Sequence, residues 1–259
     1  MTLQYRIGWD VGAWHCTRHK GSQDALVALE VIDGAPRIFG NWWRDNLSDH
    51  LHLEGDELLL KVLSLCGISP TQSAELTIAI DTPLGWPNAM MTLAAGGAAA
   101  SVPADDAENR YTRRQTEIEL AIEARTAMRS DRPFSAVRDM IGSQSTKGLH
   151  FLRAAGLNAD TPGVWRGGGE KLAVTVIETY PAEAIRRDRR LYDGLIENIR
   201  PPVAAGEDAL KDVRDALMCA VVAHLYADVA DSTDPVPAEV PAGEGWIIVP
   251  RAVAANRTP

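Results

Sequence analysis

The chain contains 259 residues, of which 46% are hydrophobic and 24% are charged, an ordinary composition for a soluble globular protein that buries a sizeable core. Its formal net charge of -9 argues against a generic DNA- or RNA-binding surface but does not exclude a local basic groove. No apolar run is long enough to span a membrane, the N-terminus lacks a signal-peptide pattern, and the three cysteines have no paired spacing. We therefore expect a cytoplasmic protein with reduced thiols and no membrane partner. The sequence leaves the oligomeric state open.

The N-terminal part predicts three strands, a helix and a fourth strand. Residues 5–12 form an apolar run bounded by glycine, which is typical of a strand buried on both faces. Residues 25–32 and 37–43 are predicted to pair as a hairpin, because Asp33 and Gly34 between them are a turn dipeptide. Helical spacing of leucine and valine predicts a helix over residues 55–66, and residues 76–81 form the next strand.

The remainder predicts a less regular middle followed by a strand and helices. Residues 93–109 are rich in alanine and glycine and predict a mobile loop, and residues 167–169 predict a flexible turn. A further strand is expected over residues 172–181, and residues 246–249 form either an edge strand or a covering segment. Helices are predicted over residues 117–128, 143–155, 181–190, 192–199 and, most strongly, 207–227.

Three of the predicted strands carry an acidic residue near the carboxyl end. These residues are Asp10, Asp81 and Glu178. Ligands of open α/β sheets bind outside the carboxyl ends of the strands. If the three strands are neighbours, the three carboxylates meet at one edge and need a metal ion or a shared proton to be stable there.

The strongest predicted helix adds two more acids to this set. Asp212 and Asp215 are three residues apart and therefore lie on neighbouring parts of one helical face. Mg²⁺ and Mn²⁺ prefer hard oxygen ligands, and a two-metal site takes several carboxylates from different elements. The pattern predicts a magnesium or manganese site formed by Asp10, Asp81, Glu178, Asp212 and Asp215, of which all but Asp212 are the candidate catalytic residues.

The β-β-β-α-β order with acids on the first and fourth strands resembles the ribonuclease H-like fold. The chain more specifically resembles the family of predicted nucleases known as DUF429, over nearly its full length. The landmarks are six motifs in order along the chain: Gly8-x-Asp10; Ala79-Ile80-Asp81-x-Pro83-Leu84-Gly85; Arg114-x-Thr116-Glu117; Glu178-x-Tyr180-Pro181; Asp212-x-x-Asp215-Ala216-x-x-Cys219-Ala220; and Gly245-Trp246-Ile247-x-x-Pro250.

This resemblance implies a single α/β domain spanning residues 1–259. The expected sheet is mixed, with an antiparallel three-strand meander and parallel strands, flanked by helices. An irregular helical insertion is expected over about residues 88–170 and a C-terminal covering segment over about residues 235–259. The implied function is a metal-dependent nuclease. Arg114, Thr116 and Glu117 are the candidate substrate-binding residues, and Arg114 would position the phosphate, since the arginine fork matches phosphate geometry.

Each candidate residue also has a purely structural explanation. Asp10 and Asp81 could cap a turn or helix at a strand end, and Asp212 could be a solvated first-turn acid favoured by the helix dipole. Glu178 could form an ion pair with Arg186 or Arg187. Arg114 could lie in salt bridges at the start of a helix.

Two other function classes fit the same topology. One is a nucleotide-binding phosphotransferase or ATPase of the actin-like type, because Asp10-Val11-Gly12 resembles the first phosphate loop of that class. That class usually needs a second related domain, which the sequence lacks. The other is a scaffold that keeps the fold without catalysis. Metal binding separates the scaffold from both enzymes, and nucleotide binding separates the two enzymes from each other.

Overall fold

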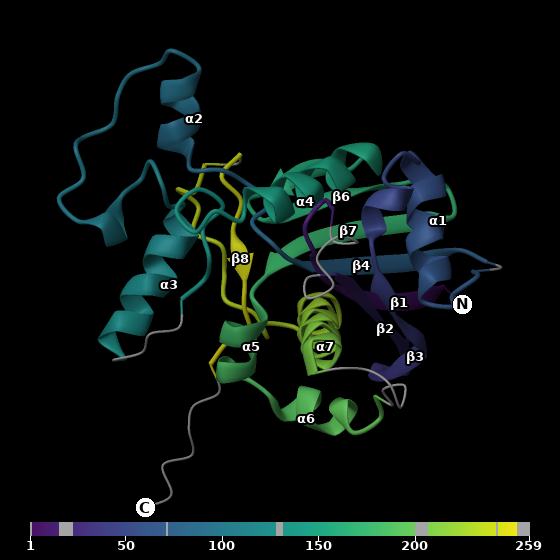
Figure 1. Cartoon of the computed structure of the whole chain (residues 1–259). Coiled ribbons are helices and arrows are strands. Elements are labelled where there is room, and N and C mark those ends of the chain that lie inside the picture. The colour runs from purple at the N-terminus through teal and green to yellow at the C-terminus, as the bar shows by residue number, and fades with distance from the viewer. Residues whose placement is uncertain are drawn as a thin grey trace, which may run out of the picture.

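A computed structural model describes residues 2–15, 23–70, 72–127, 132–199, 207–241 and 243–252. The described chain is α/β, with one mixed eight-stranded sheet in the order β3-β2-β1-β4-β7-β6-β5 and β8 beside the end of β7 (Figure 1). The strands are β1 (Leu3–Asp10), β2 (Asp24–Ile32), β3 (Ala35–Asp45), β4 (Ala74–Asp81), β5 (Asn158–Thr161), β6 (Val164–Gly168), β7 (Leu172–Thr179) and β8 (Ile247–Ile248).

Pairing directions match the expected mixed sheet. Strands β1, β2 and β3 form an antiparallel meander, whereas β1, β4 and β7 run parallel to one another. Strands β5 and β6 then return antiparallel beside β7. This arrangement of parallel and antiparallel strands flanked by helices is consistent with a ribonuclease H-like fold, as the order of predicted elements indicated.

The predicted helices form with small shifts at their ends. Helix α3 starts two residues earlier than predicted, and the helix expected over residues 181–190 ends at Arg187. The helical segments are η2 (Leu47–His50), α1 (Gly55–Leu65), α2 (Asn88–Ala94), η3 (Asp106–Glu108), α3 (Gln115–Thr126), α4 (Gly142–Ala154), α5 (Pro181–Arg187), α6 (Arg190–Ile196) and α7 (Glu207–Asp228). No helix in the described ranges is long and apolar enough to cross a membrane.

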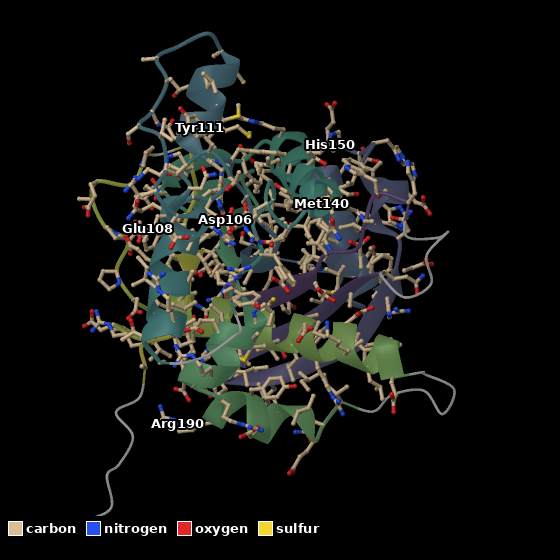
Figure 2. All side chains as sticks on the ribbon, turned by 60° about the vertical axis from the view of Figure 1, so that its left-hand side comes forward. Asp106, Glu108, Tyr111, Met140, His150 and Arg190 are labelled. Atoms are coloured by element: carbon tan, nitrogen blue, oxygen red, sulfur yellow. The ribbon has the colours of Figure 1, made fainter. Side chains whose placement is uncertain are left out.

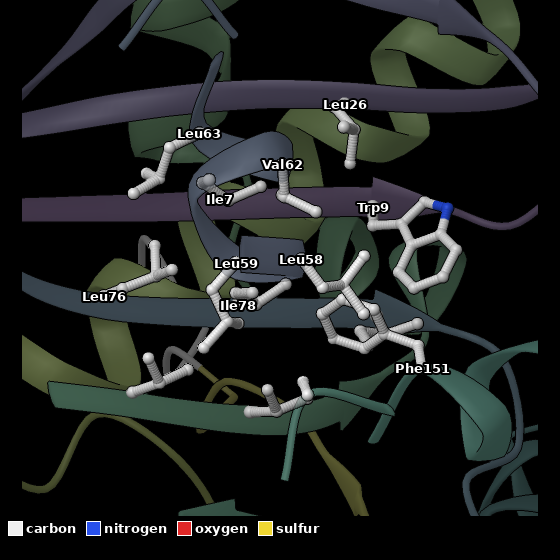
Figure 3. Close-up of a cluster of buried hydrophobic side chains, with 14 of the residues drawn as sticks. Ile7, Trp9, Leu26, Leu58, Leu59, Val62, Leu63, Leu76, Ile78 and Phe151 are labelled. Carbon is white, nitrogen blue, oxygen red and sulfur yellow. The ribbon is translucent and has the colours of Figure 1, made fainter. Parts of the chain in front are cut away.

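One face of the sheet packs against α1 and α4. The apolar side of α1, which includes Leu58, Leu59 and Val62, lies over the centre of β1 and β4 (Figure 3). At the carboxyl end of β1, Trp9 meets Phe151 of α4 edge to face, with ring centroids 5.2 Å apart. Burial of these side chains fixes both helices against the strands whose ends carry the candidate acids.

The other face of the sheet packs against α7. A Cβ atom placed on Gly8 of β1 would lie 1.8 Å from the Ala216 carbonyl oxygen and 2.4 Å from the Ala220 nitrogen. Only glycine therefore allows α7 to approach β1 this closely. This contact brings the acids of α7 next to the end of β1.

The structure corrects the expectation for residues 158–169. Gly167 and Gly168 belong to β6 and pair with β7, whereas the sequence predicted a flexible turn there. All four residues of β5 are exposed, so their side chains carry no burial pattern, and backbone pairing at the sheet edge is what makes them a strand. Residues assigned to the insertion thus extend the sheet. The C-terminal run is a strand, because β8 pairs in parallel with the end of β7.

The irregular part of the chain projects away from the sheet as an arm built of α2 and the loop that follows it (Figure 1). Helix α2 covers residues 88–94 and buries none of its side chains. At the base of the arm, the Tyr111 hydroxyl donates a hydrogen bond to the Ala100 carbonyl oxygen at 3.1 Å (Figure 2). The expected loop of residues 93–109 is therefore irregular except for the last turn of α2 and the short η3.

Candidate functional site

Three predicted acids lie at one edge of the sheet. Asp10 and Asp81 are the last residues of β1 and β4 and are direct partners in the parallel register. Glu178 is near the end of β7, where it pairs with Ile80, the residue before Asp81. Adjacent strands are about 4.8 Å apart. The prediction that the three strand-end acids lie at the same edge of the sheet is therefore confirmed.

A cavity of about 540 Å³ opens at this edge. Asp10, Asp81 and Glu178 line it from the sheet, and Asp215 and Lys211 line it from α7. The segment before α4 contributes an apolar part of the lining, with Pro133, Phe134 and Ile141. The remaining lining residues are Val11, Thr82, Pro83, Gln144, Thr179, Tyr180, Pro181, Ala182 and Ile247.

The electrostatics of Asp10 and Asp81 are those of two partly buried like charges. Burial, and then repulsion from Asp81 and Asp215, raises the pKa of Asp10 well above its usual value. Burial, followed by repulsion from Asp215 and Glu178, raises the pKa of Asp81 to about 8. Within the described chain no side chain is hydrogen-bonded to either carboxylate. The pair therefore favours a bound proton or another cation at neutral pH.

Lys211 is a site residue that the sequence reading missed. Its ammonium nitrogen is 3.3 Å from Asp215 Oδ2, one helical turn along α7. Burial raises the pKa of Asp215, and Lys211 opposes that change. The lysine side chain is 76% exposed, so it is free to move. The spacing of four residues between the two positions is a signal that could have identified it.

Asp212 is turned to a different partner. Its Oδ2 atom accepts hydrogen bonds from Arg44 of β3, with Nε at 2.8 Å and Nη2 at 2.7 Å. Asp212 is near enough to contribute to the raised pKa of Asp10, but it does not line the cavity. Its carboxylate thus links β3 to the start of α7, and its charge acts on Asp10 from outside the cavity.

Glu178 is held in a buried ion pair with Arg114. Arg114 Nη1 is 2.8 Å from Oε2 and Nη2 is 2.5 Å from Oε1, a bidentate geometry. Oε2 also accepts the Leu84 backbone N–H at 2.9 Å. The alternative that paired Glu178 with Arg186 or Arg187 is wrong about the partner: both arginines bind Glu183 and Glu123 on the outer side of α5.

The predicted substrate-binding residues are all completely buried. Arg114 Nε donates to Glu117 Oε1 at 2.7 Å, and the Glu117 side chain also accepts the Arg114 backbone N–H at 3.0 Å. Burial alone would lower the pKa of Arg114, but the carboxylates of Glu178 and Glu117 raise it. The Thr116 hydroxyl accepts the Ile247 N–H at 3.2 Å. Arg114, Thr116 and Glu117 therefore tie α3 to β7 and β8, and none of them lines the cavity.

Arg113 differs from its neighbour. It has no exposed surface, and its three guanidinium nitrogens find no hydrogen-bond acceptor among the described residues. Burial, together with the nearby Arg132, lowers its pKa. The guanidinium of Arg113 does not line the cavity either.

A second buried ion pair fixes the loop that follows Asp10. Asp24 Oδ1 accepts the Gly12 N–H at 2.9 Å and the Trp9 indole N–H at 3.0 Å. Lys147 of α4 forms an ion pair with Asp24 and donates to the Gly12 carbonyl oxygen at 3.4 Å. All these groups are buried. Gly12, two residues after Asp10, is thus held through both its N–H group and its carbonyl oxygen.

The candidate carboxylates differ in their partners. Among the described residues, no group of three or more histidines, cysteines and acids could hold a metal ion as the side chains stand. Glu178, Asp212 and Asp215 each have a cationic partner, whereas Asp10 and Asp81 form no ion pair with a described residue. Asp10, Asp81 and Asp215 are thus the acids that line the cavity outside a buried ion pair, and carboxylate oxygens are the donors that a hard cation prefers.

Comparisons with known proteins return nothing: no family model, no curated protein and no solved structure matches the chain. The similarity to DUF429 rests on the six sequence motifs alone and stays a prediction.

Proposed function

We propose that the protein is a divalent-metal-dependent phosphodiesterase, a nuclease of the ribonuclease H-like class, and that it belongs with the DUF429 family. The observation that carries the proposal is the register pairing of Asp10 with Asp81 at the mouth of the cavity. Two partly buried carboxylates that stand side by side without an ion-pair partner among the described residues are costly unless they serve a bound cation. Capping of a turn or helix does not explain them, because neither accepts a hydrogen bond from a described residue.

Asp10, Asp81 and Asp215 would hold Mg²⁺ or Mn²⁺. Such an ion would activate water and stabilise the leaving oxygen of an in-line displacement at phosphorus. Lys211 would leave Asp215 as the cation enters, and its flexible ammonium would then be available to a substrate phosphate. The exposed position of Lys211 at the cavity supports this role.

Glu178 and Arg114 have a supporting role in this proposal. Their ion pair, with the bond from the Leu84 N–H to Glu178, links the segment after Asp81 to the end of β7. Asp212 and Arg44 link β3 to α7 in the same manner. Both pairs keep the metal-binding carboxylates in position, so their loss would reduce activity through geometry.

Cleavage assays with Asp10→Asn test the proposal. The substrates are labelled single-stranded, duplex, hybrid and branched nucleic acids with Mn²⁺, and ATP hydrolysis is measured alongside. We expect the wild type to cut at least one nucleic acid and Asp10→Asn to cut none while staying folded, because the amide keeps the shape and removes the charge that holds the cation. Asp49→Asn, an exposed acid on η2, is the matched control and should cut at the wild-type rate.

Two results would replace the proposal. If the wild type hydrolyses ATP and cuts no nucleic acid, the phosphotransferase or ATPase alternative is correct. If it does neither and Mn²⁺ does not bind, the chain is a scaffold that keeps the fold. Cleavage by Asp10→Asn at the wild-type rate would assign the activity to a contaminant or another site.

A further inference from the structure

The cavity has an apolar wall that the metal-dependent reaction does not itself require. Phe134 lines the cavity together with the carboxylates and is 58% exposed. Pro133 and Ile141 line the same wall. A single exposed aromatic ring on a surface needs no explanation. Here, however, the ring lines the same cavity as Asp10 and Asp81.

The backbone around Phe134 is fixed on both sides. The Tyr180 hydroxyl donates to the Arg132 carbonyl oxygen at 3.1 Å, two residues before the ring. Directly after the ring, the Ser135 N–H donates to Asp139 Oδ2 at 2.8 Å and the Ser135 hydroxyl donates to the Thr112 carbonyl oxygen. An exposed ring on a turn with these anchors loses little conformational freedom when a ligand binds to it.

We infer that the cavity binds a single unstacked nucleotide, with its base on the ring of Phe134 and its phosphate towards Asp10 and Asp81. The inference rests on the proposed function and specifies the substrate class as single-stranded nucleic acid. A volume of about 540 Å³ lies in the range of pockets for small ligands. The bases of an intact duplex are stacked and cannot reach the ring without being flipped out.

The net charge disfavours an extended groove for nucleic acid. Proteins that bind duplex through many phosphate contacts use a basic surface, whereas this chain has a net charge of -9. Base stacking on an aromatic side chain needs no positive charge and tolerates any sequence. Contact with one or two nucleotides at the cavity therefore suits this chain better than an extended groove.

Steady-state kinetics of Phe134→Ala and Phe134→Trp with Mn²⁺ test the inference. The substrates are a single-stranded oligonucleotide and the same oligonucleotide with an abasic nucleotide at the scissile position. Stacking of one base corresponds to about 5- to 150-fold in affinity. We expect Phe134→Ala to raise the KM for the intact strand within that range, with little change in kcat and no change for the abasic strand. Phe134→Trp should keep the wild-type KM. Ile32→Ala, an exposed apolar side chain at the end of β2, is the control.

A binding measurement without turnover gives the second readout. In the double variant Asp10→Asn with Phe134→Trp, the added tryptophan should lose fluorescence when the intact strand binds and keep it with the abasic strand. If the wild type cuts nucleic acid but Phe134→Ala leaves both KM values unchanged, the inference is wrong and the nuclease proposal stands. If the wild type neither cuts nor binds nucleic acid, the proposed function fails as well.

Discussion

The carboxylate pair predicts an unusual pH dependence of stability in the absence of metal. Asp81 has a pKa of about 8 in the folded chain against an ordinary value of 3.8. The folded state thus holds a proton that the unfolded state releases. The free energy of unfolding should fall as the pH rises from about 4, and it should level off above about 8. A carboxylate that is stabilised by its partners would show the opposite sign.

The magnitude follows from the difference between the two pKa values. About 4 pH units at ~1.4 kcal/mol per unit give a ceiling of about 6 kcal/mol. Asp81 is only partly buried, so solvent screens part of this repulsion, and we expect a loss of about 2 to 4 kcal/mol between pH 5 and pH 8. For a chain of this size that corresponds to about 5 to 15 °C in Tm.

Substitution of Asp81 isolates its contribution. Asp81→Asn resembles the protonated acid at every pH, so it should match the wild type near pH 4 and exceed it by about 2 to 4 kcal/mol at pH 8. The assay is urea denaturation in EDTA, followed by tryptophan fluorescence at pH 4, 5, 6, 7 and 8. Asp49→Asn serves as the exposed control. Parallel pH curves for the wild type and Asp81→Asn would refute the reasoning about the buried carboxylates.

The contacts give three further predictions. Lys211→Met should bind Mn²⁺ up to about fivefold more tightly in calorimetry, because the ammonium group competes with the ion for Asp215. Lys171→Met, on the exposed surface, is the control and should not change the affinity for Mn²⁺. Weaker binding by Lys211→Met would contradict the role given to Lys211. Arg114→Met should cost about 3 to 5 kcal/mol in urea denaturation, because it leaves Glu178 charged and buried, and adding Glu178→Gln should restore part of that loss. Gly8→Ala should lower the amount of folded protein, measured by circular dichroism, because the added Cβ has no space against α7. A Tm equal to that of the wild type would contradict the close packing of α7 on β1.

The ends of the parallel strands were predictable from the sequence because the signal is local. A continuous apolar run that ends in one acid fixes the strand and the position of the acid together, as in β1 and β4. Parallel neighbours then place those ends at one edge without any knowledge of side-chain contacts. The helix α7 and its two acids followed from helical periodicity in the same way.

The partners of the acids could not be predicted, because they are set by tertiary packing. Arg44 is 168 residues from Asp212, and Arg114 is 64 residues from Glu178. No local pattern relates positions so far apart. As a result, Arg114, Thr116 and Glu117 were expected to bind the substrate, whereas in the structure they are buried and hold α3 against β7 and β8. The same limit applies to β5, whose exposed residues are a strand only because β6 is beside them.

The location of a bound cation tests the central claim most directly. A crystal structure with millimolar Mn²⁺, measured at a wavelength where manganese scatters anomalously, would reveal it without any assumption about activity. We predict an anomalous peak coordinated by Asp10 and Asp81, with Asp215 turned from Lys211 towards the ion. An empty site between Asp10 and Asp81 at that concentration would contradict the claim that these carboxylates form a metal-binding active site.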